Sequence, residues 1–287
     1  MELVVIKMEG KNEIKITEEK IYYKSLDGLD LCGILATPNI DIKGYVLLAH
    51  GITVDKDEGG FYADIAAELC KKGYASLRFD FRAHGESSGK QREMTIIGEL
   101  VDVKASVKKL FEYGAKQVGI IAASFGAGPV ILYTATNNDK VGCIVLLNPV
   151  IDYSKTFLNP IVPWAKESFN DEGYKNLYQK GYLLLDGIFE IGIKLVEEFQ
   201  FLTPYTFMKQ IMCPVLTIHG DKDSMVPFQV SKKHHKCNKK SSFITIFGAD
   251  HGFIKPGDEL LSSRETKEYR AHVIKGTVSW VEKYLRQ

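Results

Sequence analysis

The sequence predicts an α/β fold in which a mostly parallel sheet is flanked by helices. The chain has 287 residues, of which 45% are hydrophobic, enough for one large domain of this kind. Short runs rich in Val, Ile and Leu alternate with stretches of helical spacing. This alternation is typical of parallel strands joined by helical crossovers. We therefore expect a single domain over residues 1–287.

Apolar runs of strand length carry the prediction of the sheet. The runs expected to be parallel strands are Tyr45–Ala49, Tyr74–Phe81, Val118–Ala123, Val141–Leu147, Val215–His219 and Phe243–Phe247. Two earlier strands are expected at Glu19–Tyr23 and Leu31–Ala36. The turn dipeptide Asp27-Gly28 lies between them and predicts an antiparallel hairpin at one side of the sheet.

Helical spacing is clearest between Ile96 and Leu110, where apolar residues recur three or four positions apart. Thr95 is the expected N-cap of this helix, and Gly114 its expected stop. Further helices are expected over residues 61–72, 125–136 and 269–284.

One segment is too long for a simple crossover. About 60 residues, 151–210, separate two expected neighbouring strands. The segment opens irregularly around Pro160 and Pro163, then becomes helix-like. It is rich in aromatic residues, namely Phe157, Trp164, Phe169, Tyr174, Tyr178, Tyr182, Phe189, Phe199 and Phe201. We expect an inserted cap over one end of the sheet, although each aromatic side chain could simply fill the cap's own core.

Charge and cysteine content argue against nucleic-acid or lipid binding and against a zinc site or a disulfide framework. Lys and Arg number 37 against 36 Asp and Glu, so no net field attracts nucleic acid or anionic lipid. The five cysteines are widely spaced, which predicts free thiols in a reducing compartment rather than a zinc site or a disulfide framework. We see no signal peptide and no apolar run of membrane-spanning length, so a cytoplasmic protein is expected. The sequence is also compatible with a homo-oligomer.

The segment around Ser124 predicts a nucleophile. An apolar strand runs into Ser124, and an expected helix follows directly. A serine at such a sharp turn is held in strained geometry with its hydroxyl exposed, and it needs small residues two positions away on either side. Ala122 and Gly126 meet that need. A serine that merely caps a strand-to-helix turn is the alternative.

Two further loops, each directly after an expected strand, carry an acid and a base. Asp221 and Asp223 follow the strand at 215–219, and His251 follows the strand at 243–247. A carboxylate can fix the tautomer of an imidazole, which can then accept a serine proton near neutral pH. Asp250 is expected to be a surface residue. The chain order Ser, Asp, His, each after a separate strand, is that of α/β hydrolases.

Several short motifs make the chain resemble the α/β-hydrolase superfamily over nearly its whole length. His50-Gly51 is similar to the turn that this family uses for its oxyanion hole. Residues 80–87 resemble its D-x-R-G-H-G-x-S segment, with Ala83 in place of the usual Gly. Residues 220–227 resemble its G-x-x-D-x-x-V-P loop, which selects Asp223 over Asp221 as the acid. The serine turn departs from G-x-S-x-G only by Ala122.

Within the superfamily the chain is most similar to serine-aminopeptidase-like hydrolases and small cinnamoyl or feruloyl esterases. The resemblance implies that Ser124, His251 and Asp223 hydrolyse a small acyl substrate, with the backbone N–H groups of Ile52 and Phe125 as the oxyanion hole. No cofactor and no metal is expected. His50 and His84 are expected to have structural roles.

Three functions compete on these residues. The favoured function is hydrolysis of a carboxylic ester or thioester, and the first alternative is a peptidase or amidase with the same residues. A peptidase for free N-termini would place acids around the substrate amine, and the cap offers Glu167, Asp171 and Glu172. A non-catalytic binding protein of the same fold is the least favoured reading.

Overall fold

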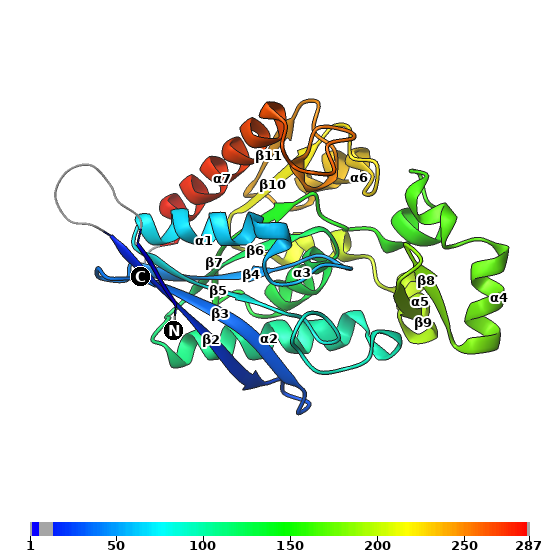
Figure 1. Cartoon of the computed structure of the whole chain (residues 1–287), viewed down its shortest axis with the longest axis horizontal. Helices are drawn as coiled ribbons and strands as arrows, with labels where there is room; N and C mark the ends of the chain where they lie inside the picture. The colour runs from blue at the N-terminus through cyan, green and yellow to red at the C-terminus, as the bar shows by residue number, and fades with distance from the viewer. Residues whose placement is uncertain (1, 6–13, 286–287) are drawn as a thin grey trace.

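A nine-stranded sheet runs through the part of the chain that the computed structural model describes, residues 2–5 and 14–285. Its order is β1-β2-β3-β5-β4-β6-β7-β10-β11 (Figure 1). The strands are β1 Glu2–Val5, β2 Lys15–Lys24, β3 Asp30–Pro38, β4 Gly44–Ala49, β5 Tyr74–Phe79, β6 Val118–Ala123, β7 Val141–Leu147, β10 Val215–Gly220 and β11 Ser241–Ile246. All pairings from β5 to β11 in this order are parallel. The predicted α/β fold with a mostly parallel sheet is confirmed.

The antiparallel side of the sheet contains the predicted hairpin. Strands β2 and β3 pair in antiparallel register, and Gly28 in their turn has a φ of +95° that favours glycine. Strand β3 then pairs antiparallel with β5. Strand β1 pairs with the outer edge of β2 and was not predicted, because four residues are too few to show a period. Along the sheet's other edge, β11 ends at Ile246, one residue earlier than expected.

Helices cover both faces of the sheet, as predicted (Figure 1). Helices α1 (Phe61–Lys71) and α7 (Arg264–Tyr284) bury apolar side chains against one face. Helices α2 (Ile96–Glu112) and α3 (Ala127–Thr136) cover the other face. The Thr95 side chain accepts a hydrogen bond from the Gly98 N–H and caps α2, as expected. Among the described residues, no helix has both the length and the apolar character that crossing a membrane requires.

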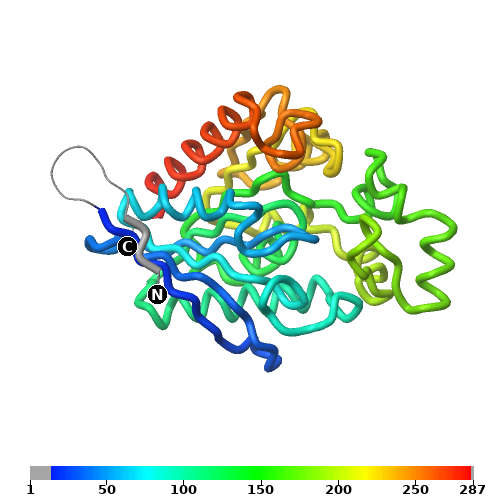
Figure 2. Tube along the Cα trace, in the orientation of Figure 1, coloured from blue at the N-terminus to red at the C-terminus, as the bar shows by residue number. Residues whose placement is uncertain are grey.

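The segment between β7 and β10 forms a small body at one end of the sheet, coloured green to yellow-green (Figure 2). We call residues 151–210 of it the insertion. Its regular elements are α4 Asp171–Lys180, β8 Tyr182–Leu185, β9 Phe189–Gly192 and α5 Ile193–Phe201. The β8–β9 hairpin was not predicted. Its turn nevertheless contains the dipeptide Asp186-Gly187, in which both residues adopt the positive φ that hairpin turns favour.

Aromatic side chains join the insertion to the main domain. Phe157 and Phe199 stack with ring centroids 4.6 Å apart, and Tyr153 stacks on Phe199 at 5.3 Å. All three rings also contact Phe125, the residue after the predicted nucleophile. Trp164 and Phe169 also contact Phe157, whereas Phe201 is 80% exposed. The cluster therefore belongs to both the insertion and the strand-to-helix turn at Ser124.

Ala83 has a strained backbone conformation whose cost can be measured. Its φ is +63°, a conformation that costs an L-residue about 1–2 kcal/mol and that glycine adopts freely. We expect Ala83→Gly to raise the free energy of unfolding by about 0.5–1 kcal/mol, because relief of strain exceeds the entropy cost of glycine in the unfolded chain. Urea denaturation would measure this change. Ala67→Gly inside α1 is the control and should destabilise by about 1 kcal/mol.

Candidate active site

Ser124 lies at the sharp turn between β6 and α3. Its φ of +46° places a non-glycine residue in the left-handed region, as expected for a serine held at a strained turn. Ala122 and Gly126, two positions before and after Ser124, explain how the strand and the helix can approach so closely at this turn. A Cβ atom on Gly126 would lie 2.3 Å from the His50 carbonyl oxygen, so only glycine fits there. Ala122 is fully buried between β4 and β7, where a small side chain suffices.

Asp223 lies in the loop after β10, and its side chain is fully buried. Four donors surround its carboxylate. The backbone N–H groups of Met225 and Val226 donate to Oδ1 at 3.0 and 2.7 Å, and ring nitrogens of His219 and His251 lie 3.1 and 2.9 Å from Oδ2. Burial alone would raise the pKa of Asp223. The charge of His251 and the hydrogen bonds from both histidines instead hold that pKa well below its ordinary value.

His251 begins the short turn after β11, and its Nδ1 faces Asp223. Burial would lower the pKa of His251, but the charge and hydrogen bond of Asp223 raise it above the ordinary 6.5. Asp221 makes no such contact, because its carboxylate instead accepts the Gly248 N–H at 2.6 Å. The structure thus pairs the imidazole with Asp223, the acid that the loop motif selects.

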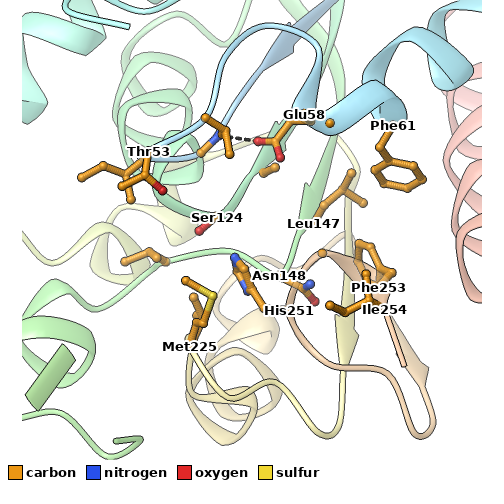
Figure 3. Close-up of a pocket in the computed structure, with 18 of the residues that line it drawn as sticks. Thr53, Glu58, Phe61, Ser124, Leu147, Asn148, Met225, His251, Phe253 and Ile254 are labelled. Carbon is orange, nitrogen blue, oxygen red and sulfur yellow. Dashed lines mark hydrogen bonds between the residues drawn. The ribbon is translucent and has the colours of Figure 1, made fainter. Parts of the chain in front are cut away.

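Ser124 and His251 face each other across a cavity of about 280 Å³ (Figure 3). Most of the walls are apolar, with Phe61, Leu147 and Phe253 from the main domain. Phe157 and Trp164 from the insertion complete one side. The cavity therefore combines a hydroxyl, an imidazole and an apolar chamber, which suits an acyl group next to a polar reaction centre.

The backbone beside Ser124 is held by His50, which is fully buried. Its Nε2 accepts the Phe81 N–H at 2.9 Å, so the hydrogen must reside on Nδ1, which donates to the Gly51 carbonyl at 2.6 Å. This bond fixes the plane of the Gly51–Ile52 peptide and turns the Ile52 N–H to the side opposite the His50 ring. Burial lowers the pKa of His50, so the ring stays neutral. His50 thus has a hydrogen-bonding role in the structure, as predicted.

Glu58 lines the same cavity and was not predicted. Its Oε1 accepts the Gly51 N–H at 2.6 Å, and its side chain points into the space beside Ser124 (Figure 3). A Cβ atom on Gly51 would lie 3.4 Å from Glu58 Oε1 and 3.6 Å from Ser124 Oγ, so both oxygens lie close to one point. Burial raises the pKa of Glu58. No local sequence pattern links Glu58, seven positions after Gly51, to the site.

The acids of the insertion lie elsewhere. Glu167, Asp171 and Glu172 are exposed and do not line the cavity at Ser124. Asp250 is partly exposed, which agrees with the expected surface position, and its carboxylate also joins two loops. Its Oδ1 accepts hydrogen bonds from the Ser224 N–H and hydroxyl and from the His251 N–H.

One group of side chains has the composition of a cation site. Ligand atoms of Cys32, Asp80 and Glu86 lie within 4.8 Å of one another. The Lys56 ammonium, however, binds Asp80 at 2.9 Å and Glu86 at 3.1 Å. Because the lysine already supplies a positive charge to these carboxylates, the group is an ion-pair network of the main domain.

Comparison with known proteins places the chain in a family. The model of the family described as serine aminopeptidase, S33, matches residues 40–185. The monoacylglycerol lipase of Mycolicibacterium smegmatis is 22% identical over 76% of this chain and 84% of its own length. The bifunctional esterase/perhydrolase DCH of Acinetobacter calcoaceticus is 31% identical over 63% of this chain and 76% of its own. The mitochondrial palmitoyl-protein thioesterase ABHD10 of Bos taurus is 26% identical, and the match spans only 52% of that protein.

Solved structures agree on the fold. Est1E of Butyrivibrio proteoclasticus, with ferulic acid bound, superimposes with a TM-score of 0.73 at 22% identity and covers 91% of this chain and 99% of its own. The Pyrococcus furiosus esterase Pf2001 gives a TM-score of 0.67 at 21% identity, over 94% of this chain and 92% of its own. The predicted resemblance is confirmed, and the chain is a member of the serine aminopeptidase (S33) family of α/β hydrolases.

Proposed function

We propose that this protein is a serine hydrolase of carboxylic esters or thioesters, with Ser124 as nucleophile, His251 as base and Asp223 as the acid that orients His251. The observation that carries the proposal is the 2.9 Å contact between His251 Nδ1 and Asp223 Oδ2, in a cavity where the imidazole faces a serine of φ +46°. Relatives named as lipase, esterase and thioesterase support ester or thioester chemistry.

The reaction begins when Ser124 Oγ attacks the acyl carbon and its proton passes to His251. The negative oxygen of the tetrahedral intermediate accepts hydrogen bonds from the Ile52 and Phe125 N–H groups, each of which contributes about 3–4 kcal/mol of barrier lowering. The ionised Asp223 stabilises the imidazolium. His251 then gives its proton to the leaving alcohol or thiol, and later takes one from the water that releases the acid.

We further propose that residues 151–210 act as a cap on a single domain spanning residues 1–287, of which residues 1, 6–13 and 286–287 lie outside the described part. Phe157 and Trp164 support this proposal, because the insertion contributes them to the cavity wall. An apolar wall there favours an apolar acyl chain.

All five cysteines are free thiols, which supports the expected cytoplasmic location.

Active-site labelling tests the assignment of Ser124. A fluorophosphonate probe should label the wild-type protein at Ser124 and should not label Ser124→Ala, since the probe bonds only to an activated hydroxyl. Intact-protein mass spectrometry measures the adduct. Equal labelling of both proteins would exclude Ser124 as the nucleophile, and no labelling of either would favour a non-catalytic binding protein.

A peptidase or amidase is the second candidate, and Glu58 is the observation that favours it. Its carboxyl lies beside Ser124, where it could accept a hydrogen bond from a substrate ammonium, whereas Glu167, Asp171 and Glu172 lie outside the cavity. A panel of 4-nitrophenyl esters and matched aminoacyl 4-nitroanilides separates the candidates. Esters should be turned over at least about tenfold faster than the amides, and faster turnover of the amides would reverse the assignment.

The rate should depend on pH through His251. Activity requires the neutral imidazole, so kcat/KM should fall as the pH drops through the His251 pKa of the free enzyme. Because that pKa is raised above 6.5, the midpoint of the acid limb should lie above 6.5. A profile of kcat/KM from about pH 5 to 9, which spans the ordinary pKa of histidine, measures this midpoint, and a midpoint below 6.5 would contradict the assignment.

A further inference from the structure

A second histidine shares the buried carboxylate of Asp223. His219 is the next-to-last residue of β10, and its side chain is fully buried. Its Nε2 lies 3.1 Å from Asp223 Oδ2, the same oxygen that His251 Nδ1 approaches to 2.9 Å. With Met225 and Val226 N–H on Oδ1, all four contacts of the carboxylate are donors.

The surroundings of His219 determine where its hydrogen resides. An ionised carboxylate only accepts, so His219 Nε2 must carry a hydrogen. The other ring nitrogen, Nδ1, is buried and has no hydrogen-bond partner among the described residues. A hydrogen on this second nitrogen would be a buried donor without an acceptor, which is costly. His219 is therefore a neutral imidazole that donates from Nε2, and its ring packs edge-on against Phe228 at 5.6 Å.

His219 does not line the cavity at Ser124, so it cannot contact an acyl substrate there. Its effect must pass through Asp223. Two N–H donors on one oxygen share the negative charge of that oxygen, and each weakens the bond that the other makes. The two donors also fix the rotation of the carboxylate, because neither oxygen can move without losing a bond.

We propose that His219 is a positioning residue. It holds the Asp223 carboxylate in place and weakens the hydrogen bond between Asp223 and His251. The inference rests on the proposed function of Ser124, His251 and Asp223. It assigns a role to the third member of a buried histidine–carboxylate–histidine arrangement, in which only His251 reaches the substrate.

Removing the donor changes the base in a defined direction. Without His219 Nε2–H, the charge on Asp223 Oδ2 acts on His251 alone, so the His251 imidazolium becomes more stable and its pKa rises. Other charged groups near His251 are Glu58, Asp250 on its own loop, and Arg270 of α7, which donates to the Gly252 carbonyl. None of these three contacts His219, so they act equally in wild type and variant.

The test compares His219→Leu, which removes the donor, with His219→Gln, whose carboxamide can still donate to Asp223. In His219→Leu the acid limb of kcat/KM should move to higher pH by on the order of one unit. The plateau value of kcat/KM should fall roughly tenfold, because the carboxylate loses a fixed partner. His219→Gln should keep the limb within about 0.3 units of wild type (a small fraction of a typical shift). A merely structural role would lower activity without moving the limb.

NMR of the wild-type protein gives a second measurement that does not depend on whether His219→Leu folds. The ¹⁵N shifts of His219 should show a protonated Nε2 and an unprotonated Nδ1 under the conditions of the activity plateau. The opposite tautomer, an unmoved limb in His219→Leu, or an equal shift in His219→Gln would each overturn the inference. Failure of fluorophosphonate labelling in wild type would instead overturn the proposed function, so the two failures are distinct.

Discussion

Replacing Asp223 by Asn should lower kcat about 10⁴-fold while the protein stays folded. The Asn side-chain oxygen can still accept the N–H groups of Met225 and Val226. Its amide nitrogen, however, then faces His251 as a donor. His251 must turn its unprotonated nitrogen toward this donor, so the nitrogen facing Ser124 carries a hydrogen and cannot accept the serine proton. Steady-state kinetics on a 4-nitrophenyl ester measure the loss.

The matched control for Asp223→Asn is Asp221→Asn, two residues earlier in the same loop. Asp221 accepts the Gly248 N–H, and the oxygen of an Asn can accept the same bond. Its kcat should stay within about threefold of wild type, since it makes no contact with His251 (about 0.7 kcal/mol on the rate scale). If Asp221→Asn were the damaging change, the acid would have to be reassigned to Asp221.

Gly126→Ala should reduce both stability and activity. The new Cβ would lie 2.3 Å from the His50 carbonyl oxygen and 3.1 Å from the Ala49 carbonyl oxygen, and a backbone oxygen cannot move aside as a flexible side chain can. Helix α3 must therefore shift away from β4. We expect a loss of about 3 kcal/mol in the free energy of unfolding, measured by urea denaturation. Fluorophosphonate labelling should also slow, because Ser124 moves with the turn.

Gly276→Ala is the control for adding a Cβ at Gly126. Gly276 lies inside α7, and its new Cβ would meet only side-chain carbons of Ile218 and Ile244 at 3.6 Å, an ordinary contact. Alanine is the better helix former, so this variant should gain up to about 1 kcal/mol. A Gly126→Ala variant as stable as Gly276→Ala would mean that the turn at Ser124 tolerates a side chain at position 126.

The sheet and the positions of Ser124, Asp223 and His251 could be predicted because each depends on local patterns. Ser124 directly follows one strand, Asp223 and His251 lie in the loops after two others, and the ends of parallel strands meet at one edge of a sheet. Features that depend on tertiary contacts could not be predicted. Glu58 reaches the site only because its own φ is +48° and its loop folds back to the Gly51 N–H. In the sequence, His219 is indistinguishable from an ordinary strand residue, because its contact with Asp223 exists only in the folded structure.

The presence of the insertion could be predicted from the sequence, but its internal structure could not. Its presence follows from chain length alone, because about 60 residues exceed any crossover. Its hairpin was missed although Asp186-Gly187 is a hairpin dipeptide, since four-residue strands with polar residues between them give no clear period. Pattern could not identify which aromatic side chains face the main domain, because Phe157 and Phe201 differ in burial but not in type.

The aromatic contacts of Phe125 limit how freely the insertion can be exchanged between related proteins. Phe125 directly follows Ser124, yet its ring packs among Tyr153, Phe157 and Phe199. A chimera that carries a foreign insertion would leave this ring without its partners and open a void beside the nucleophile. Engineers who wish to change substrate range by grafting should therefore transplant the insertion and the residue at position 125 together, as one unit.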